Sequence, residues 1–167
     1  MTVEPDLRER VRQTLRLLPT GVGVVTTQVD GRPLGLAVNA FSSVSLEPPL
    51  VLVCVNRSAE THEHLYAGQH FGVNFLASDQ AEIAATFARS GGNKFAALSW
   101  LTGAACGVPI IDGVSAFLEA QVQRRLAAGT HTIFLGQVLE AQAYAKPPLL
   151  YQGGDFFDGG KLTVPPG

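Results

Sequence analysis

The chain has little cysteine and little charge. Cys54 and Cys106 are its two cysteines, one in an apolar run and one in a loop, so neither a disulfide framework nor a zinc ribbon can be drawn from them. This usage indicates a reducing compartment, and we expect a cytoplasmic location. Charged residues make up 16% of the chain and the net charge is −2, so the basic surface that nucleic-acid binding needs is missing.

Long apolar runs are missing too. No stretch reaches the ~20 apolar residues that span a bilayer, and the charged side chains among the first 20 residues exclude a secretory signal. We therefore expect no membrane contact. The 167 residues predict one domain over 1–167, with a core at about 12–157 and a loose tail at 158–167. Low charge beside 46% apolar residues predicts that a second subunit covers some surface, in a homodimer.

Several familiar motifs are absent. Gly21-Val22-Gly23 lacks the third glycine and the helix of a dinucleotide fingerprint, and the segment Gly113–Phe117 misses the nucleophile elbow of serine hydrolases at its last residue. His62 and His64 begin a predicted helix, point to different faces and have no carboxylate cluster nearby, so we expect no metal site.

The chain does contain many strand-like runs, organised around the stretch 35–58. Within it, Leu50–Val55 is apolar throughout and lies between two prolines and Asn56-Arg57-Ser58, which predicts a strand buried on both faces. Other runs predict strands at 21–29, 71–76, 114–123, 130–143 and 149–151, and helices at 5–18, after Ser58 and at 78–89. Turn-length connections favour a mainly β fold: a small antiparallel barrel with two or three helices outside it.

Local signals add finer expectations. Thr61 is placed to cap the second helix and Gly68 to end it, while Ser78 or Asp79 is placed to cap the third. The segment 104–112 is expected to be a connecting loop, and the chain from Gly153 onward is expected to be loose. Alternation over 114–123 predicts one wet face, formed by Glu119, Gln121 and Gln123.

Three sets of residues are candidates for chemistry. Arg57, Ser58 and Thr61 place a guanidinium and two hydroxyls at a helix N-terminus, as a phosphate site needs, although a plain helix cap explains them equally well. Arg89 and Lys94 could close over the same anion, and a solvated loop explains them as readily. His131 opens a strand, where a hydrogen-bonded strand-end histidine is the commoner interpretation.

In order and spacing, these segments resemble the flavin reductase family with the FMN-binding split β-barrel fold, an antiparallel, Greek-key-like barrel. The resemblance covers about 12–157 and rests on Pro19–Val22, Val38–Ser45, Val55–Ser58, Phe71–Asn74, Phe87-Ala88, Lys94-Phe95, His131–Gly136 and Leu149–Tyr151. It implies hydride transfer from NADH or NADPH to FMN, or to FAD or riboflavin. The reduced flavin would then supply a partner flavin-dependent monooxygenase.

The resemblance also implies site residues. The flavin ring and ribityl chain would lie along Val38, Asn39, Ala40, Ser43 and Ser45, and the ribityl chain and phosphate beside Cys54, Val55, Asn56, Arg57, Ser58 and Thr61, with Phe87, Arg89 and Lys94 on the outer side. His131, with the catalytic role, would border the nicotinamide, near Thr20 and Tyr151. Relatives in this family commonly carry aspartate where this chain has Thr130, which cannot supply that charge beside His131, so the resemblance leaves both NADH and NADPH as possible substrates.

Three other readings fit the same fold. The barrel could bind flavin or haem without catalysis, it could hold FMN tightly and act on another substrate, or it could serve as a dimeric scaffold. The polar set at Asn39, Ser43, Arg57, Ser58 and Thr61 weakens the scaffold, which has no need of it.

Overall fold

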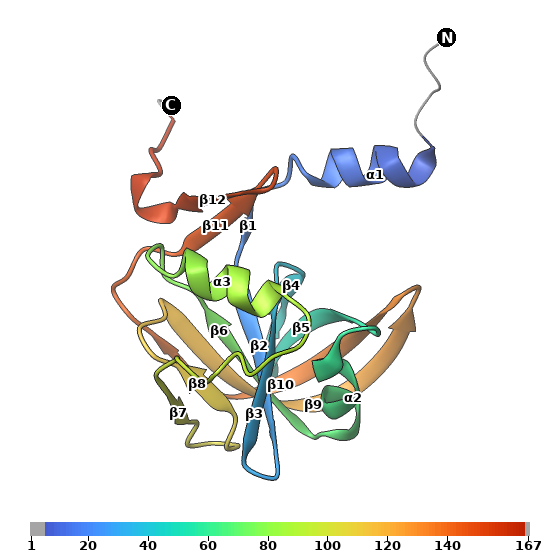
Figure 1. The fold of residues 1–167 in the computed structure, drawn as a ribbon, viewed down its shortest axis with the longest axis vertical. Coiled ribbons are helices and arrows are strands. Elements are labelled where there is room, and N and C mark those ends of the chain that lie inside the picture. The colour runs from blue at the N-terminus through green and yellow to red at the C-terminus, as the bar shows by residue number, and fades with distance from the viewer. Residues whose placement is uncertain (1–5, 166–167) are drawn as a thin grey trace.

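The structure, a computed structural model, describes residues 6–165 and is mainly β, as predicted (Figure 1). Three α-helices, α1 (Leu7–Leu15), α2 (Glu60–Ala67) and α3 (Ala81–Ala88), accompany twelve strands. The strands are β1 (Thr20–Gly21), β2 (Gly23–Val29), β3 (Arg32–Val38), β4 (Phe41–Leu46), β5 (Pro49–Asn56), β6 (His70–Phe75), β7 (Trp100–Thr102), β8 (Pro109–Ile111), β9 (Ala116–Ala128), β10 (His131–Ala143), β11 (Leu149–Gln152) and β12 (Asp155–Asp158). A 3-10 turn, Gly159–Lys161, follows β12.

Seven of the strands form one curled antiparallel sheet in the order β3-β2-β6-β9-β10-β5-β4. No ladder joins the edge strands β3 and β4, so the barrel is split rather than closed. The chain passes directly from β3 to β4 through Asn39 and Ala40, and this link is held to β5 by the Cys54 amide, which donates to the Ala40 carbonyl oxygen at 3.0 Å. Two small sheets, β1-β11-β12 and β7-β8, flank this sheet. The predicted split-barrel fold is confirmed.

Two apolar clusters form the core. One fills the curl of the sheet, where Val25, Val53, Phe71 and Phe134 pack together, and the other lies under α3 around Phe87. The β2–β3 hairpin predicted at Asp30-Gly31 is present, with the positive φ of 49° and 77° that such a turn requires.

The prediction that Leu50–Val55 is buried on both faces is wrong. Val51, Val53 and Val55 face the core, whereas Leu52 and Cys54, on the other face, are half-buried. On the neighbouring strand, Ile133 and Leu135 are the register partners of Cys54 and Leu52 and are half-buried too. The outer face of β5 and β10 is therefore apolar but incompletely covered.

The wet face predicted for β9 is also wrong at Glu119, which is 0% exposed. Its carboxylate accepts hydrogen bonds from the Ala105 amide at 3.2 Å and from the Cys106 amide at 2.8 Å, so loop backbone replaces water. Burial and this carboxylate raise the pKa of the Cys106 thiol to about 12. The segment 104–112 is thus not a plain loop, since it also contains β8.

The helix caps differ from the predicted ones. Ala59 is the N-cap of α2, and no side chain caps this helix by a hydrogen bond. Thr61, the predicted cap, instead donates to the Gly35 carbonyl oxygen at 3.2 Å. Gln80 is the N-cap of α3, so neither Ser78 nor Asp79 fills that position. Gly68 ends α2, as predicted. The chain beyond Gly153 is ordered into β12 and the 3-10 turn, and residues 166 and 167 of the predicted loose tail lie outside the described residues.

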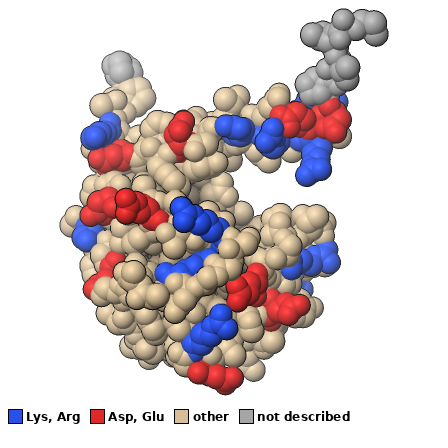
Figure 2. Space-filling model, viewed as in Figure 1, with Lys and Arg blue, Asp and Glu red and all other residues tan. Residues whose placement is uncertain are grey.

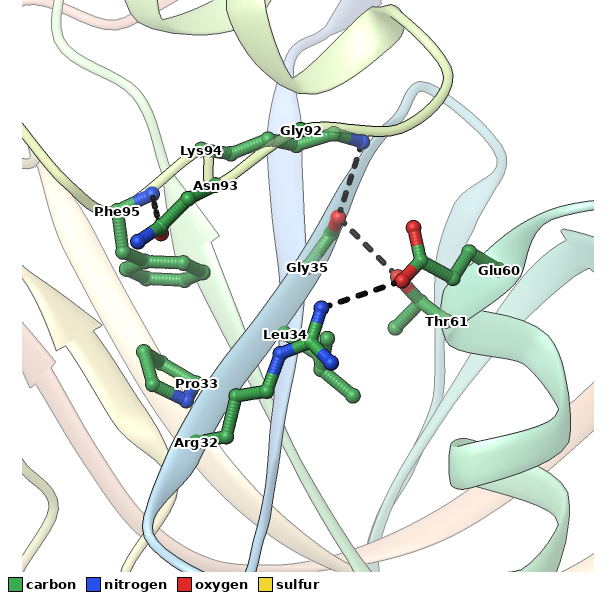
Figure 3. Close-up of a pocket in the computed structure, with 10 residues that line it drawn as sticks. All are labelled: Arg32, Pro33, Leu34, Gly35, Glu60, Thr61, Gly92, Asn93, Lys94 and Phe95. Carbon is green, nitrogen blue, oxygen red and sulfur yellow. Dashed lines mark hydrogen bonds and ion pairs between the residues drawn. The ribbon is translucent and has the colours of Figure 1, made fainter.

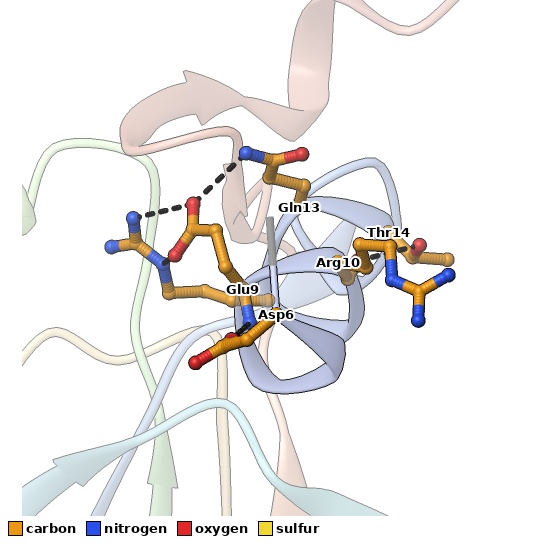
Figure 4. A network of polar contacts seen from close by, with 6 residues as sticks. Asp6, Glu9, Arg10, Gln13 and Thr14 are labelled. Atoms are coloured by element: carbon orange, nitrogen blue, oxygen red, sulfur yellow. Dashed lines mark hydrogen bonds and ion pairs between the residues drawn. The ribbon is translucent and has the colours of Figure 1, made fainter. Parts of the chain in front are cut away.

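Helix α1 projects from the body as an arm (Figure 1). It is shorter than the predicted 5–18, because Asp6 caps it by accepting from the Glu9 amide at 2.8 Å and regular helix stops at Leu15. Its polar side is held by contacts within the helix, from Arg12 and Gln13 to Glu9 (Figure 4). Its apolar side chains, Leu7, Val11 and Leu15, are all exposed. Figure 2 shows the hollow that separates this arm from the body.

None of the helices in the described residues combines the length and apolarity needed to span a bilayer. Residues 6–165 contain no group of three or more metal-ligating side chains.

Candidate functional site

The first part of the site is a small pocket between β3, the start of α2 and the loop after α3 (Figure 3). Its centre is the Gly35 carbonyl oxygen, which accepts from the Thr61 hydroxyl at 3.2 Å and from the Lys94 ammonium at 3.4 Å. Gly35 must be glycine here, because a Cβ would lie 2.9 Å from the ring of Phe87. The close approach of β3 to α3 thus places a hydroxyl and an ammonium in one pocket.

Positive charge dominates this pocket. Lys94 also donates to the Phe87 carbonyl oxygen at 3.3 Å, and its ammonium lies 5.9 Å from the Phe87 ring centre. Burial lowers the pKa of Lys94, while nearby Glu60 opposes that shift. Arg32 lines the same pocket and pairs with Glu60 at 3.3 Å. Two cations against one carboxylate make this pocket suitable for an anion.

Sequence reasoning missed Arg32. The arginine stands in the β2–β3 hairpin, and its partner Glu60 lies 28 residues further along the chain. The two residues meet because α2 packs beside β3, and no local sequence pattern predicts that packing.

The second part of the site is the turn between β5 and α2. The Asn56 side-chain oxygen accepts from the Ser58 amide at 2.9 Å and from the Ser58 hydroxyl at 3.0 Å, and Arg57 donates to the Gly129 carbonyl oxygen. His131 is the register partner of Asn56. The Thr130 hydroxyl lies 3.0 Å from His131 Nδ1, so the side chain next to this imidazole is a neutral hydroxyl.

The structure does not gather the predicted phosphate residues into one cluster. Thr61 and Lys94 share the Gly35 carbonyl oxygen, whereas Arg57 lies against the β9–β10 turn. His62, the residue after Thr61, contacts Thr132 on β10, so consecutive residues of α2 face two different sides. Arg89 is the exposed C-cap of α3.

The third part of the site is a cavity of about 230 Å³ beside the β3–β4 link. It brings Val38 and Asn39 together with Tyr151, and Thr20 is the register partner of Tyr151 in the small sheet. The Thr20 hydroxyl is buried and has no hydrogen-bond partner among the described residues. A buried hydroxyl in that state fits a bound polar group nearby.

Phe156 is a lining residue that sequence reasoning missed. Its ring lies 5.8 Å from that of Tyr151, and both line the cavity with Asn39. The sequence signal was hidden because Gly153-Gly154 was interpreted as the start of a loose end, whereas β12 pairs with β11. The two rings form an aromatic wall opposite Val38.

Ser43 and Ser45, two of the predicted flavin residues, do not line this cavity. Ser43 and Ser45 face Val51 and Leu50, at the opposite end of β5 from Asn56. Asn56 is five steps along the strand from Val51, which is about 16 Å at 3.3 Å per residue, so Ser43 and Ser45 are distant from the turn at Asn56. Ala40 and Cys54 lie between these ends, joined by a backbone hydrogen bond, and Val55 faces the core.

Comparison with known proteins decides the family. The family model described as "Flavin reductase like domain" matches residues 15–160. The chain belongs to this family. It is therefore a flavin reductase, an oxidoreductase that passes hydride from a reduced nicotinamide to a flavin. Family membership disfavours the binding-only barrel and the scaffold.

Individual relatives agree with this assignment. The chain is 40% identical over 159 residues to the "NADH-dependent FAD reductase" of Streptomyces globisporus, covering 92% of this chain and 87% of that protein. It is 39% identical over 145 residues to the "FMN reductase (NADH) SmoA" of Agrobacterium fabrum, covering 87% and 82%. The solved structure of the S. globisporus NADH:FAD oxidoreductase SgcE6 with NAD and FAD fragments superposes with a TM-score of 0.87 and 38% identity, over 99% of this chain and 98% of that one.

Proposed function

We propose that this flavin reductase uses NADH to reduce a dissociable flavin and supplies the product to a monooxygenase. The observation that carries the proposal is that two pockets lie along β3 and together form the rim of the site: the basic pocket at Gly35, and the cavity that Val38 and Asn39 line with Tyr151 and Phe156. Bound flavin would supply the hydride acceptor. The chain would supply binding and orientation.

Each part of the rim has a role in this proposal. Thr61, Lys94 and Arg32 bind the anionic end of the flavin, with the positive charge that a phosphate needs. Val38 and the small side chains around it leave room for a flat ring, which can pack against the rings of Tyr151 and Phe156. His131 orients the nicotinamide from the side of Asn56, and Thr130 holds the imidazole ring. Close, aligned contact between the two rings is what this arrangement contributes to the rate.

Relatives support the monooxygenase partner. The reductase component of the 4-nitrophenol 4-monooxygenase/4-nitrocatechol 2-monooxygenase of Rhodococcus opacus is 36% identical over 154 residues, covering 92% of this chain and 82% of that protein. A reductase that serves a separate oxygenase must release its flavin, and the exposed positions of Asn39, Ala40 and Arg57 are consistent with an open site. The cytoplasmic location stays a prediction that rests on the two free cysteines.

The test is the loss of NADH and then NADPH absorbance at 340 nm with FMN, FAD or riboflavin in excess, against a blank without flavin. Fast oxidation that depends on added flavin and prefers NADH is expected. Oxidation that needs no added flavin would replace the dissociable flavin with a tightly held one. No oxidation with any pair, in protein shown to bind flavin, would overturn the proposal.

A homodimer belongs to the same proposal. The α1 arm exposes Leu7, Val11 and Leu15, and the outer face of β5 and β10 leaves Leu52 and Ile133 half-covered. One chain cannot satisfy both surfaces, because the arm stands away from the body (Figure 2). Two copies related by a two-fold axis could cover both at once.

The dimer has a direct test. Ile133→Glu places a charge in the outer face and should convert a dimer to a monomer in light-scattering chromatography. Leu101→Glu, at an exposed leucine on β7, is the matched control and should remain dimeric. A monomeric wild-type protein, or a dimeric Ile133→Glu variant, would refute this interface.

A further inference from the structure

A cavity of about 440 Å³ opens between α2 and the tip of the β9–β10 hairpin, and the proposed reaction gives it no role. It is larger than the cavity beside Tyr151 and within the size range of small-molecule sites. Arg57, His62, Glu63, Tyr66, Ala127 and Thr132 line it.

The aromatic wall of this cavity is firmly held. His62 is 7% exposed, and its Nε2 lies 2.8 Å from the Thr132 hydroxyl. Its ring stacks with that of Tyr66 at 5.8 Å and 29°, and Phe134 meets both rings edge-on. Arg125 lies over the Tyr66 ring at 5.8 Å and donates to the Gly68 carbonyl oxygen. Tyr66 is nevertheless 54% exposed, so it offers a fixed, accessible aromatic surface.

Charge is distributed unevenly around the cavity. Burial and the neighbouring Arg57 lower the pKa of His62, so its imidazole is neutral at pH 7. The cationic group of the lining is therefore Arg57, in the turn before α2, while Glu63 offers a hydrogen-bond acceptor. A planar base can stack on Tyr66, a phosphate can meet the guanidinium fork of Arg57, and ribose hydroxyls can donate to Glu63.

We propose that this cavity binds the adenosine 5′-phosphate half of a dinucleotide substrate. The inference rests on the proposed function, which brings two such substrates, FAD and NADH, to this rim. Arg57 directly follows Asn56, the register partner of His131, so the cavity begins where the candidate nicotinamide site ends. His62 lies on the other side of α2 from Thr61, so this cavity is separate from the basic pocket, and a dinucleotide would enter it past Asn56 and Arg57.

The test removes the stacking surface and compares substrates with and without the adenosine half. Stacking of a base on an aromatic side chain is worth about 1 to 3 kcal/mol, or roughly a 5- to 150-fold change in affinity. In Tyr66→Ala the KM for FAD should rise by such a factor while the KM for FMN stays unchanged, if the FAD half occupies the cavity. If the NADH half does, the KM for NADH measured with FMN should rise instead.

Two variants control for indirect effects. Tyr66→Phe keeps the ring and should restore the wild-type KM, and Tyr144→Ala removes a 50% exposed tyrosine elsewhere and should change nothing. Unchanged KM values for FAD and NADH in Tyr66→Ala would overturn the inference. An equal rise for FMN and FAD would also overturn it, because the variant would then act on the flavin site as a whole.

Binding of AMP itself separates this inference from the proposed function. Millimolar AMP should shift the amide resonances of α2 and the β9–β10 tip in the wild type and not in Tyr66→Ala. Such shifts in a protein that reduces no flavin would uphold the cavity and refute the reductase. Flavin reduction without any AMP-induced shift at these elements would uphold the reductase and refute the cavity.

Discussion

Replacing Lys94 with methionine removes the ammonium group from the basic pocket and keeps most of the aliphatic chain that packs on Phe87. The ammonium makes two long hydrogen bonds, 3.3 and 3.4 Å, to the carbonyl oxygens of Phe87 and Gly35, so it can turn toward a phosphate at little cost. A hydrogen bond to a charged group is worth about 1.5 to 3 kcal/mol. Because Lys94 is partly exposed, we expect the lower end, roughly a tenfold rise in the KM for FMN.

Riboflavin, which lacks the phosphate, is the decisive comparison in this assay. Its KM should not change in Lys94→Met, and Lys146→Met, which removes an exposed ammonium that donates to the Gly113 carbonyl oxygen at 3.0 Å, should change neither KM. Equal rises for FMN and riboflavin would refute the reasoning, because Lys94 would then only tie α3 to β3. An unchanged KM for FMN would place the phosphate elsewhere.

Three further predictions concern catalysis and stability. His131→Ala should slow NADH-dependent turnover while the Kd for flavin, measured by fluorescence quenching, stays unchanged; unchanged turnover would remove His131 from the site. Because the pKa of His62 is lowered in the folded protein, the unfolded chain takes up a proton there at higher pH than the folded chain, so the free energy of unfolding falls as the pH drops below 6.5. Urea titrations at several pH values should show a shallower fall of this free energy in His62→Gln than in the wild type. Equal pH dependence in the two proteins would contradict this. Gly136→Ala puts a Cβ 2.6 Å from the buried Phe71 ring and should lower the free energy of unfolding by about 1 to 3 kcal/mol. In a Phe71→Leu background the same substitution should cost less, because the smaller side chain leaves room for the Cβ. A double-mutant cycle with non-additive free energies would verify this contact.

The architecture was readable from the sequence because strand signals are local. The strand-like run over 130–143 and the turn at Asp30-Gly31 each report a feature that a few neighbouring residues determine, and the structure has β10 and a hairpin there. Whether a side chain is buried depends instead on which other elements pack against its face of the strand. The apolar run at Leu50–Val55 carries no sign that its outer face is only half-covered, and the alternation around Glu119 carries no sign that two loop amides replace water.

Part of the site could also be predicted from the sequence, where its residues lie in short, continuous segments. The segments at Val38-Asn39 and at Tyr151 could be assigned by resemblance, and the structure brings them to one cavity. Residues that act through tertiary contacts could not be assigned correctly. Thr61 was interpreted as a cap, and Arg57 as its neighbour in one anion site, because spacing along a helix does not tell which partner each side chain will find.

The first turn of α2 imposes a constraint on chain length in this protein. Thr61 reaches Gly35 and the next residue, His62, reaches Thr132, on different sides of the helix. Each residue of an α-helix advances the rotation by about 100°, so inserting or deleting one residue between Asn56 and Thr61 would turn both side chains away from their partners at once. Substitutions in this link should therefore be tolerated far better than changes of its length, and relatives that differ in sequence there should keep the same number of residues.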